Sequence, residues 1–144
     1  MGLLKGIAYK TTSRAEMITK DSVFVSLENG VQGDLRGKAG KRQLTILSEE
    51  AFLEACLQLG TSLDWTIRRA NLLVSGIELE QTTGKKLRIG DLLLEITGET
   101  EPCFRMDEQF EGLKDALMPN WRGGVTAKVL SEAHIQTGDK VNWI

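Results

Sequence analysis

The sequence has one histidine and only two cysteines among its 144 residues, and both shortages restrict its chemistry. A metal site built on two histidines is excluded. His134 lies in the polar segment SEAHIQTGD, which predicts a solvated turn residue. Two cysteines are too few for an iron–sulfur cluster or for the disulfide framework of a secreted domain.

Several other common features are also missing. No apolar run approaches the ~20 residues of a membrane span. The beginning, MGLLKGIAYKTT, lacks a signal-peptide pattern, and Gly6 stands where a myristoylation signal needs Ser or Thr. The net charge of -2 gives no sign of a nucleic-acid or membrane-surface binder. We therefore expect a cytoplasmic protein without nucleic-acid or membrane partners.

The sequence does contain many short apolar segments separated by glycine-rich turns. Its length suits one domain, residues 1–144, and no linker or low-complexity tract interrupts it. Alternating or short apolar runs predict strands at Leu3 to Tyr9 and in SVFVSLENGVQGD, RQLTILS, ANLLVSG, KKLRIGDLLLEITG and GGVTAKVLSEAHIQTGDKVNWI. The last two segments should hold two strands each, broken at Gly90-Asp91 and Gly138-Asp139. With 15 glycines, this pattern is typical of a mostly β protein, a barrel or a sandwich.

Two helices should interrupt the strands. One runs over Ser48–Leu59, with Ser48 as its N-cap and Cys56 buried on its apolar face. The second runs over Asp107–Leu117, with Asp107 as its cap, and ends before Pro119.

Basic residues gather at three places in the sequence. The loop DLRGKAGKRQ, with Lys41 and Arg42, reads as a solvated hairpin loop or as an anion site, and it lacks the ending of a Walker A loop. In TIRRANLLV, strand alternation would point Arg69 and Asn71 the same way. Arg122 precedes two glycines that would let a ligand approach the backbone.

Cys103 lies in the acidic segment ITGETEPCFRMDEQF, directly after Pro102 and after a predicted strand. We expect it to be exposed. Neighbouring carboxylates should raise the pKa of its thiol, and Arg105 should lower it, so the spacing leaves its reactivity open.

The order of these motifs resembles the MOSC domain, found in molybdenum cofactor sulfurases, in amidoxime-reducing molybdenum enzymes and as small bacterial proteins. The motifs are GVQGDLRGKAGKRQLTILSEE, RRANLLVSGIELE, GKKLRIGDLLLEITGETEPC and WRGGVTAKVL followed by IQTGDKV, and the similarity runs from about Gly6 to Val141. The resemblance implies a β-barrel-like fold with a few short helices.

The resemblance also implies a site for molybdopterin, the organic part of the molybdenum cofactor. Cys103 would be the family cysteine, which carries sulfur or ligates molybdenum. Arg69 and Asn71 would help to hold the pterin and its phosphate. The remaining implied or candidate contacts are Lys41, Arg42, Gln43 and Arg122.

Two functions follow from the resemblance. One is a molybdopterin-binding sulfur carrier or a cofactor-bound reductase component. The alternative is a non-catalytic module that binds the cofactor or a partner. No aminotransferase-like domain precedes the motifs, so we expect sulfur or electrons to come from a partner, either an electron donor or a molybdoenzyme. A structural barrel with an incidental cysteine is a third possibility.

Overall fold

Seven strands close into a barrel in the computed structural model, which describes residues 2–144. The neighbours run β1, β6, β5, β9, β8, β7 and β11, and β11 pairs again with β1. The strands of this ring are β1 Gly2–Tyr9, β5 Leu44–Ser48, β6 Leu72–Ser75, β7 Lys86–Ile89, β8 Leu92–Glu99, β9 Val125–Ser131 and β11 Lys140–Trp143. The expected mostly β, barrel-like fold is therefore confirmed.

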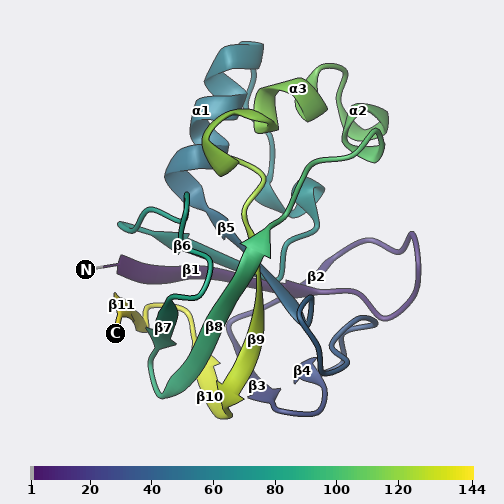
Figure 1. Cartoon of the computed structure of the whole chain (residues 1–144). Coiled ribbons are helices and arrows are strands. Elements are labelled where there is room, and N and C mark those ends of the chain that lie inside the picture. Colours follow the sequence, from purple (N-terminus) through teal and green to yellow (C-terminus); the bar gives the residue numbers. More distant parts are fainter. Residues whose placement is uncertain (1) are drawn as a thin grey trace.

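Four further strands complete the β structure of residues 2–144. β2 (Ile18–Lys20) extends the barrel sheet by pairing with the end of β1. A separate small sheet has the order β10, β3 and β4, with bounds Ala133–Gln136, Ser22–Ser26 and Gly30–Val31. Figure 1 shows this small sheet at the end of the barrel opposite the helices.

Only one neighbouring pair in the barrel is parallel, β5 with β6. A parallel pair needs a crossover connection. Helix α1 (Glu49–Leu59) and the 3₁₀ helix η1 (Trp65–Arg68) form it. Ser48 caps α1 by accepting a hydrogen bond from the Ala51 N–H at 3.2 Å, and Gly60 ends it at φ 67°. The predicted first helix is confirmed at both ends.

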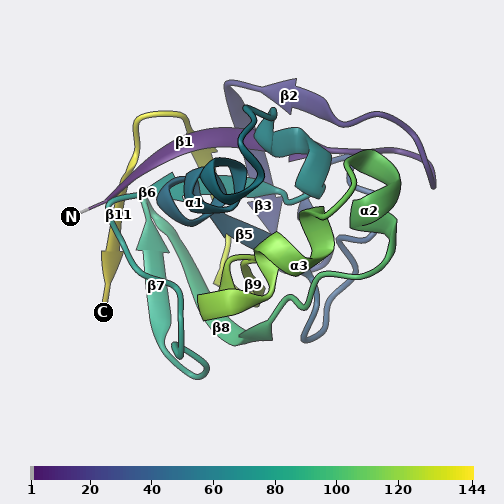
Figure 2. The ribbon, with the colours of Figure 1, turned by 90° about the horizontal axis from the view of Figure 1, so that it is seen from above.

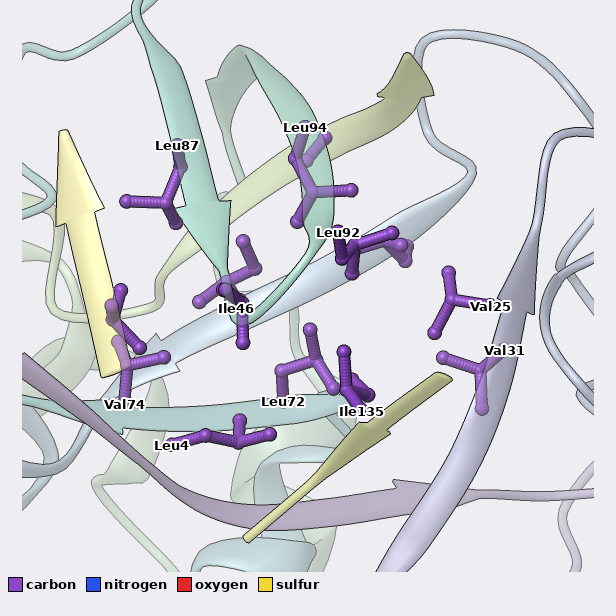
Figure 3. Close-up of a cluster of buried hydrophobic side chains, with 14 of the residues drawn as sticks. Leu4, Val25, Val31, Ile46, Leu72, Val74, Leu87, Leu92, Leu94 and Ile135 are labelled. Carbon is purple, nitrogen blue, oxygen red and sulfur yellow. The ribbon is translucent and has the colours of Figure 1, made fainter. Parts of the chain in front are cut away.

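The barrel interior is filled by aliphatic side chains from its own strands and from the small sheet (Figure 3). On β8, Leu92, Leu94 and Ile96 have no exposed surface, whereas the residues between them are half-buried. A second apolar cluster lies under the helices and includes Phe52 and Cys56. Cys56 is 3% exposed, as expected.

The second predicted helix is wrong in its length and in its cap. The segment forms two short helices, α2 (Arg105–Gln109) and α3 (Leu113–Leu117), separated by Gly112 at φ 88°. Asp107 lies inside α2, and its carboxylate accepts the N–H of Lys114 at 2.9 Å. Asp107 therefore ties α2 to the beginning of α3.

The C-terminal segment also differs from the expected pair of strands. It holds three, because the chain leaves the barrel after β9 and β10 joins β3 in the small sheet. His134 lies on β10 and is exposed, so it is a solvated strand residue and not a turn residue. No helix within residues 2–144 is long and apolar enough to cross a membrane.

Candidate functional site

Cys103 lies in a groove of about 600 Å³ on one side of the barrel, which we call the Cys103 groove. Its walls come from the β1–β2 loop, the segment between β4 and β5, the end of η1, and the chain from Thr100 through α2. Figures 1 and 2 show that the β1–β2 loop, the β4–β5 segment and α2 project from the same side. Segments far apart in sequence thus form a single site.

The thiol of Cys103 is accessible, unlike that of Cys56. It follows the buried Pro102 and stands at the entrance to α2, where its carbonyl accepts the N–H of Met106 at 2.9 Å. Upstream, the N–H of Thr100 donates to the Gly124 carbonyl at 2.9 Å. The cysteine is therefore exposed on a segment that is fixed on both sides.

Arg68 holds this segment from behind. Only 8% of it is exposed, and its guanidinium donates to the carbonyls of Gly123 at 3.0 Å and Thr100 at 3.1 Å. Burial lowers the pKa of Arg68 to about 10, while the nearby Cys103 raises it and Arg42 lowers it further. Among the described residues no carboxylate lies within 4 Å of this cation.

Arg69 and Asn71 both line the groove, but not through strand alternation. They precede β6, and Arg69 adopts the left-handed conformation at φ 64°. Asn71 is 6% exposed; its Oδ1 accepts from the Thr45 N–H at 3.0 Å, and its Nδ2 donates to the Ala8 carbonyl at 3.2 Å. Most of its amide capacity thus connects β1 to β5.

The neighbours Lys41, Arg42 and Gln43 have three different environments. Arg42 is exposed and lines the groove, whereas Lys41, which was also expected to face Cys103, does not line it. Gln43 is 2% exposed; its Nε2 donates to the carbonyls of Leu27 and Gly37, and its Oε1 accepts from the N–H of Val129. Its amide has no donor left for a ligand.

Arg122, a candidate ligand contact in the sequence, lies outside the Cys103 groove. Its guanidinium donates to Gln58 Oε1 at 2.7 Å and to the Ala116 carbonyl at 3.0 Å, and it lies 3.6 Å from the carboxylate of Glu54. It therefore connects α3 to α1 and lines a different concavity.

The groove concentrates positive charge on a chain whose net charge is -2. Its basic side chains are Lys10, Arg14, Arg36, Arg42, Arg68, Arg69 and Arg105. Its acidic side chains are Asp34, Glu101 and Glu108. None of the seven cations forms an ion pair within residues 2–144, where the ion pairs are Arg122–Glu54 and Lys128–Glu95. The groove suits an anionic ligand.

Sequence reasoning missed Lys10, Arg105 and Thr100 as groove residues, and it noted Arg68 only as part of the basic segment TIRRANLLV. The hydroxyl of Thr100 is buried in the described chain without a hydrogen-bond partner, and the residue is 7% exposed. The doubled arginine RRAN was the only local signal for Arg68. Lys10 and Thr100 directly follow the ends of β1 and β8, and Arg105 begins α2, so no local pattern marked them.

No set of three or more histidine, cysteine or carboxylate side chains in residues 2–144 is arranged to hold a metal ion. A metal at this groove would therefore rely on Cys103 and on ligands that the chain does not supply.

The comparisons with known proteins agree with this fold. A sequence model of the MOSC domain matches residues 29–142. The YuaD protein from Bacillus subtilis superposes with a TM-score of 0.82 at 22% identity, over 98% of this chain and 94% of that one. YiiM from Geobacillus stearothermophilus gives 0.76 at 16% identity, over 100% and 75%. YiiM from Escherichia coli gives 0.74 at 15% identity, over 99% and 69%. No curated protein matches the chain.

Proposed function

The chain belongs to the MOSC domain family, and on that premise we propose that it binds a molybdenum cofactor in the Cys103 groove. In this proposal the Cys103 sulfur either coordinates the metal or carries a transferable sulfur atom. The MOSC family is associated with this cofactor, and the groove contains the residues that would bind it.

One observation carries the proposal. The exposed thiol of Cys103 lies in the same groove as Arg42, Arg69 and Asn71, although these residues are distant in sequence. A phosphate-bearing pterin needs fixed N–H donors for its anionic end and a soft ligand for its metal. The Cys103 groove contains both kinds of group, guanidinium donors and a cysteine sulfur.

The residues present fit such a group. Unpaired guanidinium groups can bind a phosphate, and the unpartnered hydroxyl of Thr100 offers a buried polar contact in the same groove. The cysteine thiolate is the type of ligand that soft metal centres prefer. When bound, the cofactor supplies redox chemistry at its metal, which no side chain of this chain can supply.

The residues of the chain have separate roles in the proposed site. Arg42 and Arg69 bind and orient the anionic end of the cofactor. Asn71 and Gln43 hold the strands that form the groove wall, through their hydrogen bonds to the backbone. Arg68 and Pro102 fix the segment that presents Cys103. A partner protein delivers electrons or receives sulfur, because residues 2–144 hold no cluster of cysteines for a second redox centre.

The test is metal analysis of the protein expressed in a host that makes the cofactor. We expect near-stoichiometric molybdenum and a visible absorption band in the wild type. Arg69→Met should lose most of the metal. Lys41→Met removes the same charge outside the groove and should keep it. A wild-type protein without molybdenum or pterin would contradict the proposal.

A second assay separates the two functions that the family allows. Protein loaded with cofactor is tested for persulfide transfer and for reduction of an N-hydroxylated substrate with an artificial electron donor. Either activity supports the sulfur-carrier or reductase function. Bound cofactor without either activity identifies a non-catalytic binding module.

A further inference from the structure

Thr100 is a buried residue of the groove wall whose hydroxyl has no partner. It directly follows β8, lines the Cys103 groove and is 7% exposed. Its backbone groups are both hydrogen-bonded, the N–H to the Gly124 carbonyl at 2.9 Å and the carbonyl to the Arg68 guanidinium at 3.1 Å. Its Oγ1 is covered from solvent and makes no hydrogen bond within residues 2–144.

An unpartnered hydroxyl in the interior lowers stability, because burial removes its hydrogen bonds to water and nothing replaces them. Thr126, a buried threonine on the neighbouring strand β9, shows the usual arrangement. It is 3% exposed, and its hydroxyl lies 2.7 Å from Thr97 Oγ1. Valine has nearly the shape of threonine and would avoid the loss at position 100. The hydroxyl of Thr100 therefore fits a role in which a ligand completes its hydrogen bonding.

The other polar groups of the groove indicate which part of a ligand this is. The guanidinium and ammonium groups only donate, and they pair with anions. Thr45, the other threonine of the groove, is already hydrogen-bonded to Asn71. A free hydroxyl both donates and accepts, so it suits an uncharged N–H or ring nitrogen. Thr100 stands three residues before Cys103, which keeps this contact within about 10 Å of the cysteine along the chain.

We propose that Thr100 is a specificity-determining residue that hydrogen-bonds to the uncharged heterocycle of the ligand, next to the part that Cys103 holds. The inference rests on the proposed function, in which that heterocycle is a pterin. Rotation about the Cα–Cβ bond by one staggered step carries the hydroxyl from its covered position toward the groove. The hydrogen bond then forms only in the complex, so the ligand-free protein lacks its contribution to stability.

The first experiment compares melting temperatures of the cofactor-free variants. Thr100→Val should raise the melting temperature by about 2–6 °C, because it removes an unpartnered polar group and keeps the shape. Thr126→Val is the matched control and should lower it by a similar amount, because its hydroxyl has a partner. A fall in both variants would show that the Thr100 hydroxyl is already hydrogen-bonded in the free protein, and the inference would be wrong.

The second experiment measures binding of pterin-6-carboxylate and of inorganic phosphate to the same cofactor-free proteins by calorimetry. Thr100→Val should weaken pterin-6-carboxylate about three- to tenfold and leave phosphate within about twofold, because phosphate needs only the cations. Thr100→Ser keeps the hydroxyl and should retain the wild-type affinity within about twofold. Equal loss in the valine and serine variants, equal loss of both ligands, or no pterin binding by the wild type would overturn the contact.

Molybdenum content separates this inference from the proposed function. Thr100→Val loaded in a cofactor-making host should hold less molybdenum than Thr100→Ser. Equal molybdenum in both variants would overturn the contact and leave the proposed function standing. A wild type without molybdenum, together with selective loss of pterin-6-carboxylate binding in Thr100→Val, would overturn the proposed function and support the contact.

Discussion

The guanidinium of Arg68 donates to the carbonyl oxygen of Thr100 at 3.1 Å, and this contact places a buried cation directly behind the cysteine segment. Gly123 packs beside both groups, and its carbonyl accepts the second hydrogen bond of the guanidinium. The position of Cys103 therefore depends on the close packing of groups that never touch a ligand.

Gly123→Ala tests this packing. An added Cβ would lie 2.5 Å from the Thr100 carbonyl oxygen and 3.3 Å from the Arg68 guanidinium. We expect a loss of about 1–3 kcal/mol in the free energy of unfolding and a changed thiol-labelling rate at Cys103. Gly98→Ala is the control, because its nearest neighbour is 3.9 Å away. Chemical denaturation and labelling kinetics check both variants, and equal behaviour would contradict the packing role.

Cys103→Ser and Cys56→Ser should have opposite effects. Cys103 is exposed, so its replacement should shift stability by less than about 0.5 kcal/mol while bound molybdenum or transferable sulfur falls sharply. Cys56 is 3% exposed, so a serine hydroxyl there should cost about 1–3 kcal/mol and leave the cofactor chemistry intact. Melting curves and metal content measure both effects. Full cofactor loading of Cys103→Ser would contradict the role of Cys103 as a metal ligand and favour the non-catalytic binding module.

The adjacent residues Arg42 and Gln43 should separate ligand binding from stability. Gln43→Met removes hydrogen bonds to Leu27, Gly37 and Val129, and we expect a loss of about 2–5 kcal/mol in unfolding free energy. Arg42→Met changes an exposed groove cation, so stability should stay within about 0.5 kcal/mol while phosphate binding weakens. Denaturant unfolding and calorimetry distinguish the two. Unchanged phosphate affinity in Arg42→Met would remove Arg42 from the site.

Glu99→Gln should change the pH dependence of stability. Burial raises the pKa of Glu99 above its usual 4.5, and the nearby Glu101 and Glu80 raise it further. Between pH 4.5 and the raised value, the folded protein binds more protons than the unfolded chain, so the contribution of Glu99 to stability falls as pH rises. The variant should therefore gain stability relative to the wild type as pH rises through this window.

Unfolding free energies measured between pH 4 and pH 7 check this expectation. Glu16→Gln makes the same charge change on the exposed β1–β2 loop and serves as the control. A similar pH-dependent gain in both variants would indicate an effect of net charge and not of the surroundings of Glu99.

Much of the secondary structure follows from local sequence, because hydrogen bonding and side-chain periodicity act over a few residues. The apolar run that follows Gly90-Asp91 predicted β8, and Ser48 as N-cap predicted the beginning of α1. The break at Gly112 was missed, because the stripe of Phe110, Leu113 and Leu117 has helical spacing on both sides of it. There the tertiary structure overrode a plausible local pattern.

By itself the sequence determined a mostly β chain with an exposed Cys103 and a buried Cys56. Tertiary structure alone decided which basic residues meet that thiol. It placed Arg68 against Gly123, 55 residues away, and turned Arg122 toward α1 instead. The spacing of apolar residues indicates which face of its own strand or helix a residue occupies. Which residues of distant segments come together depends instead on strand order and barrel closure. These arise from pairing between segments that local sequence does not specify.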